Sequence, residues 1–153
     1  VTSFAAEGSL DDGNTISDSI PVTAEVGKYA EIIAGDAMAF DFEGSANESI
    51  SADSSFDVES NCDINLDFSV TALDNDAGDY IKVDYAINAD LLDEAHTFTT
   101  ETATVDTNLD GIQGQDNHVV NYGVNAVATL GAISDQAAGS YDATMTITVS
   151  AAN

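Results

Sequence analysis

The sequence predicts an all-β protein whose strands form an antiparallel β-sandwich. Apolar and polar side chains alternate along five segments, β-branched residues are frequent in these segments, and no stretch has the spacing of a long amphipathic helix. Such alternation indicates sheets with one buried face and one face in water, as in antiparallel sandwiches. A closed barrel is the alternative architecture.

The predicted strands follow one another along most of the chain. The five clear segments are residues 20–26, 62–72, 81–91, 120–130 and 141–149. Weaker candidates are residues 30–33, 37–43, 54–59 and 97–105. Turn-forming residues concentrate at 74–79, 106–117 and 134–140, and a short helical turn is possible near residues 89–96.

Two parts of unequal size are expected. Gly8 to Ser19 has the composition of a linker, rich in Asp, Asn, Ser, Thr and Gly. We therefore predict an N-terminal arm and linker over residues 1–19 and one β-sandwich domain over residues 20–153.

The charge is strongly negative. Lys28 and Lys82 oppose 28 acidic residues, which gives a formal net charge of −26. Nucleic-acid binding needs a basic surface, so that class is excluded. Self-repulsion of this size is tolerable when salt shortens the screening length to about 3 Å at 1 M, which favours a halophilic source. An ordinary acidic secreted protein that binds divalent cations is the alternative.

An extracellular location is expected. The chain begins at Val1 without an initiator methionine, as it would after removal of a signal peptide. No apolar stretch is long enough for a membrane span, and Cys62, the one cysteine, has no partner for an intrachain disulfide. Cys62 falls in an alternating segment, which predicts a buried, unreactive thiol.

Several segments resemble fibre-forming β-sandwich families. Residues 138–150 (AGSYDATMTITVS) resemble the closing strand of spore-coat-U-like and chaperone–usher pilins and of similar archaeal fibre subunits. Residues 22–32 (VTAEVGKYAEI) resemble their first core strand, and residues 56–70 (FDVESNCDINLDFSV) the next pair. Archaeal bundling pilins and TasA-like biofilm fibre subunits are the members to compare first, because they lack a helical type IV stalk.

The resemblance implies an Ig-like or pilin-like jelly roll and polymerisation by donor-strand complementation. In such fibres an N-terminal strand completes the sheet of the next subunit, and main-chain hydrogen bonds carry the affinity. The donor arm would be residues 1–10, with residues 14–22 as the alternative. Its interface residues would be Val1, Phe4, Ala5, Ala6 and Leu10, with Phe4 as the main anchor.

Catalytic chemistry is not expected. His96 and His118 are far apart in sequence and belong to no catalytic motif, and the chain has no nucleophile elbow, phosphate-binding glycine loop or paired cysteines. We therefore predict that the protein is not an enzyme.

Two sites of modification or metal binding are candidates. Asp106, Asn108 and Asp110 with Gly111 match the first half of a calcium loop, and Asp116 stands near its end, although the expected final Glu is missing. A polar loop of turn-forming residues is the alternative, and residues 74–79 are a weaker calcium candidate. Asn47 begins an Asn-x-Ser sequon and is a candidate for glycosylation.

The function expected from these features is that of a structural subunit. We predict a homopolymer with head-to-tail contacts, a pilus or matrix fibre serving cell adhesion or biofilm formation, with no certain cofactor and calcium as the one possible ligand. The alternative is a secreted, calcium-dependent β-sandwich that binds carbohydrates or surfaces as an adhesin.

Overall fold

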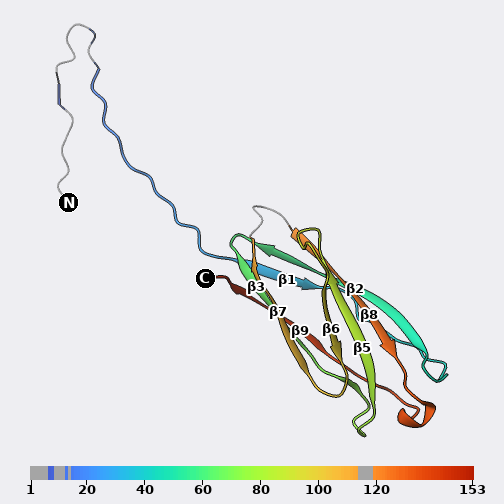
Figure 1. Ribbon diagram of the computed structural model, residues 1–153. Helices are drawn as coiled ribbons and strands as arrows, with labels where there is room; N and C mark the ends of the chain where they lie inside the picture. Colours follow the sequence, from blue (N-terminus) through green and yellow to red (C-terminus); the bar gives the residue numbers. More distant parts are fainter. Residues whose placement is uncertain (1–6, 9–12, 14, 114–118) are drawn as a thin grey trace.

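The computed structural model describes residues 7–8, 13, 15–113 and 119–153. In this part of the chain two antiparallel sheets pack against each other, so the predicted β-sandwich is confirmed (Figure 1). None of its helical segments has the length and apolar character needed to cross a bilayer.

The larger sheet contains six strands. Their order is β1-β2-β8-β5-β4, and β6 pairs with β5 on the edge that β4 also borders. Every pair is antiparallel. The bounds are β1 (Ala30–Ala34), β2 (Ser49–Ser60), β4 (Leu73–Asp74), β5 (Tyr80–Asn88), β6 (His96–Thr100) and β8 (Val119–Thr129).

The smaller sheet contains three strands in the order β7-β3-β9. Their bounds are β3 (Ile64–Val70), β7 (Val105–Ile112) and β9 (Met145–Ala151). A single 3-10 turn, η2 (Ile133–Asp135), lies between β8 and β9. Because β3 occupies the middle, β9 has a hydrogen-bonded partner along one edge only within the described part of the chain.

The core lies between the sheets, and its residues follow the alternation that the sequence shows. Leu66, Phe68 and Val70 of β3 are buried, as are the inward residues of β5 and β8. Phe56 stacks on Tyr122 with 4.8 Å between ring centroids and meets Phe68 edge-on at 5.9 Å. These aromatic contacts join the two sheets at the centre of the sandwich.

The prediction of a turn over residues 106–117 is wrong for residues 106–112. These residues belong to β7, and the register against β3 shifts between Ile64 and Leu66. Gly111 at that point has φ 63°, and its N–H donates to the Asn65 side chain. The Asp-Gly pair therefore forms a β-bulge inside β7. The prediction failed because turns use the same two residue types.

The strand predicted at residues 20–26 is not formed. Its apolar side chains are exposed, and the sandwich begins after it. The segment has the strand pattern, but no described strand pairs with it. Cys62 lies in the turn between β2 and β3 and is half-buried, so its predicted strand position is also wrong.

Candidate functional site

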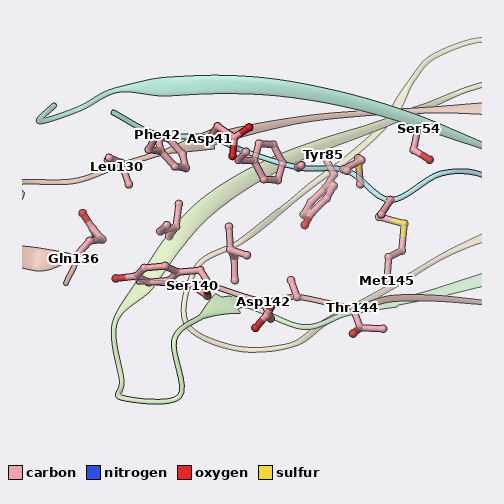
Figure 2. A pocket seen from close by; sticks show the side chains of 18 of the residues that line it. Asp41, Phe42, Ser54, Tyr85, Leu130, Gln136, Ser140, Asp142, Thr144 and Met145 are labelled. Carbon is pink, nitrogen blue, oxygen red and sulfur yellow. The ribbon is translucent and has the colours of Figure 1, made fainter. Parts of the chain in front are cut away.

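One long edge of the sandwich is open. A groove of about 1250 Å³ runs between residues 34–45, from the end of β1 onward, and residues 136–147, which lead into β9 and include its start. Figure 2 shows Asp41 and Phe42 on one side of it, Ser140, Asp142 and Thr144 on the other, and Tyr85 between them. The floor consists of core residues of the larger sheet, among them Phe56, Ile81 and Val124.

One wall is an extended segment without a strand partner, residues 36–43. Met38, Phe40 and Phe42 alternate with exposed residues and pack against the core, as the inward residues of a strand would. Among the described residues, however, no backbone–backbone hydrogen bond joins this segment to another strand. The weak strand predicted at 37–43 therefore has the side-chain pattern of a strand and lacks the hydrogen-bond ladder.

This wall begins at Gly35, where the backbone comes very close to β2. A Cβ atom at this position would lie 2.2 Å from the Ser55 carbonyl oxygen, so only glycine allows so close an approach. Pairing of β1 with β2 ends at Ala34, and the Ser54 hydroxyl donates to the Asp36 carbonyl oxygen at 2.5 Å. The chain leaves the larger sheet here and becomes the wall of the groove.

Glu48 holds the other end of this wall. Its carboxylate accepts hydrogen bonds from the backbone N–H groups of Glu43 (3.3 Å), Gly44 (3.0 Å) and Ser45 (3.2 Å). The bond from Glu43 and those from Ser45 and Gly44 lower the pKa of Glu48, although partial desolvation opposes them. The ionised carboxylate therefore fixes the turn that closes the wall.

The opposite wall is bonded on one side only. Asp142 and Asp74 exchange two backbone hydrogen bonds. The Thr144 carbonyl oxygen accepts from the Thr71 N–H, and the Thr144 N–H donates to the Thr71 hydroxyl. From Met145 onward β9 continues the same edge pairing with β3. The second edge of this wall faces the groove, and among the described residues no strand pairs with it.

The groove is apolar inside and acidic at its rim. Met145, Ile147 and the inward residues of the facing wall are only half-buried, whereas the inward residues of β3 are fully buried. Tyr85 points into the space, and its pKa is raised by burial against a smaller opposing effect of Thr100. The charged residues among the described lining are all carboxylates: Asp36, Asp41, Glu43 and Asp142. Two facing wall edges and an apolar floor are the features that bind an additional strand.

The N-terminal arm leaves the sandwich at a defined point. The Asn61 side chain donates to the Gly27 carbonyl oxygen at 2.9 Å and accepts from the Tyr29 N–H at 2.7 Å. Upstream of this clamp, no hydrogen bond joins residues 15–26 to the described part of the sandwich. Figure 1 shows this segment running away from the body.

The predicted donor residues Val1, Phe4, Ala5, Ala6 and Leu10 lie outside the described residues. So does His118, while His96 lies in β6 with its Nε2 atom 2.8 Å from the Thr107 hydroxyl. Asn47, the sequon residue, is exposed in a turn with φ 57°. Its glycosylation stays a prediction.

The three described candidates for calcium ligands lie in a strand and do not form a loop. Asp106, Asn108 and Asp110 occupy alternate exposed positions of β7, and Asp116 lies outside the described residues. Alternate residues of a strand are about 6.6 Å apart, so these side chains do not converge as they would in a calcium loop. In the second candidate, Asp74 and Asn75 accept backbone N–H bonds of their own turn, which is the turn-forming role.

Sequence reasoning missed the groove itself. The signal was present, because residues 37–43 alternate like a strand and the pattern does not say which chain supplies the partner. Comparison of the sequence with protein families, with curated proteins and with solved structures found no match.

Proposed function

We propose that this chain is the structural subunit of an extracellular filament, a pilus or matrix fibre, in which an N-terminal strand of each subunit inserts into the groove of the next. The observation that carries the proposal is the open edge. An extended wall without a partner, a strand with one free edge and an apolar floor between them leave room for one more strand. Closing this edge buries the half-exposed apolar residues and satisfies both walls.

The positions of arm and groove favour a chain of subunits. The arm leaves at the Asn61 turn, between β2 and β3, where the C-terminus also lies (Figure 1). The groove lies toward the other end of the sandwich, beside the turn at Ser45 and the residues around Gly131. Donor and acceptor at opposite ends make a heterologous contact, and such contacts propagate into filaments when they do not close into rings.

The charge supports a salt-rich environment for this filament. Lys82 and Asp84, 3.4 Å apart, make the one salt bridge among the described residues. On the outer face of the larger sheet, carboxylates pair instead with amides: Asn121 donates to Asp57 and Asn125 to Asp53, each at 2.6 Å. A neutral amide donor satisfies a carboxylate oxygen but does not neutralise the carboxylate. The negative charges of neighbouring subunits therefore repel one another unless salt screens them.

Negative-stain electron microscopy in about 3 M salt, where the screening length is below about 3 Å, tests the proposal. We expect filaments from the full chain and monomers from a chain without residues 1–26. The truncated chain should keep its β-sheet circular dichroism, because residues 15–26, the described part of the arm next to the sandwich, make no hydrogen bond with it. Monomers from the full chain over a wide concentration range would overturn the proposal.

Dialysis provides a second measurement. Removal of salt should loosen or dissolve the filaments, since an acidic arm lies against an acidic rim. Filaments that survive in millimolar salt would indicate kinetically locked strands or bound cations, and a calcium titration separates these two cases.

A further inference from the structure

We infer that the strand received by the groove is the segment Ile20–Val26 of a second copy of this chain. The inference rests on the proposed function and assigns its donor. It differs from the leading sequence-based prediction, a donor at residues 1–10, and overlaps the alternative at residues 14–22 only in residues 20–22.

The first argument is the exposure of an apolar stripe. Ile20, Val22 and Val26 are 89%, 91% and 84% exposed, and Ala24 lies between them at the same spacing. Alternate residues of an extended chain point to one side, so the four side chains form one apolar face. Among the described residues, no part of its own sandwich covers this face, and none covers the apolar floor of the groove.

The second argument is length. Residues 20–26 extend over about 23 Å at about 3.3 Å per residue, and the unpaired wall, residues 36–43, over about 26 Å. The donor segment therefore matches the wall that it would pair with. Proline at position 21 removes one N–H, but residues 21, 23 and 25 bond to one neighbour and residues 20, 22, 24 and 26 to the other. The wall that pairs with residues 21, 23 and 25 therefore lacks one backbone hydrogen bond, and the wall that pairs with the other residues lacks none.

The third argument is the short separation in sequence between the donor segment and Gly27, where the Asn61 side chain holds the chain to the sandwich. Asn61 fixes Gly27 and Tyr29, so a donor that ends at Val26 enters the next subunit directly after leaving its own. Adjacent sandwiches would then touch end to end. A donor at residues 1–10 would instead leave residues 11–26 as a linker between sandwiches, up to about 50 Å long when extended.

Paired charge substitutions in the full chain test the assignment. Val22→Glu places a carboxylate on the apolar face, and the matched control Thr23→Glu places it on the opposite face. We expect Val22→Glu to raise the critical concentration for filaments more than about tenfold, because the groove buries the new charge, while Thr23→Glu stays within about threefold of the parent. Equal effects of the two substitutions would overturn the inference.

Two further measurements separate this inference from the proposed function. If Phe4→Glu abolishes filaments and Val22→Glu does not, the filament stands and the donor is the extreme N-terminus. The axial repeat gives an independent value: subunits in end-to-end contact repeat at about 40 Å, the length of a twelve-residue strand such as β2. A repeat tens of ångströms longer would contradict a donor at residues 20–26.

Disulfide trapping shows whether the contact is between chains. Full chains carrying Cys62→Ser and Thr23→Cys are mixed with full chains carrying Cys62→Ser and Ala39→Cys, where Ala39 is an exposed residue of the groove wall. Oxidation should give a mixed dimer whose linked peptides contain positions 23 and 39. Absence of this dimer under conditions that form filaments would overturn the inference. Complete absence of both filaments and mixed dimers would overturn the proposed function as well.

Discussion

The two long edges of the sandwich differ in how the sheets meet. At one edge β6 and β7 are in contact: His96 reaches Thr107 at 2.8 Å, stacks on Phe68 and lies tilted against Phe98. At the other edge β1 approaches β9, but residues 36–43 and residues 141–147 are separated by the groove. Both edges are built from alternating segments, so the difference lies in the number of strands available. The open edge has room for one more strand, and we propose that the arm of another subunit supplies it.

The largest effect is expected from the same substitution placed at the two edges. Ala143→Glu puts a charge on the groove wall, and Ala103→Glu puts it in the exposed connection between β6 and β7. We expect Ala143→Glu to raise the critical concentration for filaments at least about tenfold, because the inserted strand would bury the charge. Sedimentation in high salt measures this, and equal assembly of both variants would contradict the role of the open edge.

A second comparison concerns stability of the monomer. Phe68 is buried between the sheets, whereas Phe40 on the groove wall is only half-buried. We expect Phe68→Ala to lower the free energy of unfolding by about 3–5 kcal/mol and Phe40→Ala by about 1–2 kcal/mol. Denaturant titration of the monomer measures both. A loss for Phe40→Ala as large as that for Phe68→Ala would show that the wall already belongs to the closed core.

A smaller effect is expected at the clamp of the arm. Asn61→Ala removes the two side-chain hydrogen bonds to Gly27 and Tyr29, each worth about 0.5–1.5 kcal/mol in general. Because the site is exposed, we expect a loss of about 1 kcal/mol in the free energy of unfolding, with Asn108→Ala in β7 as the control. Proteolysis near residues 27–29 should become faster in Asn61→Ala, and an unchanged cleavage rate would contradict the clamp.

The sequence predicts the sandwich well where a strand has its partner in the same chain. The alternating segments of β3, β5 and β8 are confirmed, because each buries one face against the opposite sheet. The prediction was wrong at residues 20–26, where the same alternation finds no partner in its own sandwich. The alternation of apolar and polar residues indicates which side chains can be buried together. It does not indicate whether the same chain or another chain buries them.

Two other differences have local causes. The start of β2 was missed because residues 49–53 are mostly Ser, Asp and Ala, which have low strand propensity, and pairing with the long β8 outweighs that preference. The groove depends on the placement of residues 36–43 opposite residues 141–147, about a hundred positions away in the sequence. Local patterns do not fix such a juxtaposition.

The smallest effect is expected at Glu48, in acid. Hydrogen bonds from the turn lower the pKa of this carboxyl, so its stabilisation is fully present above the ordinary glutamate pKa and is lost as the pH falls through the lower pKa of the folded protein. Glu48→Gln should therefore unfold more easily than the parent at neutral pH and approach it in acid. Thermal unfolding across this range measures the difference, and a constant difference would contradict the role of the charge.

Hydrogen exchange at the unpaired wall tests the central claim most directly. In 3 M salt, the amides of residues 36–43 should exchange rapidly in the Ala143→Glu monomer and slowly in filaments of the parent chain, because an inserted strand supplies their missing hydrogen-bond partners. The amides of β3, bonded on both sides, serve as a reference that is protected in both samples. Filaments in which residues 36–43 exchange as fast as in the monomer would contradict strand insertion at this edge.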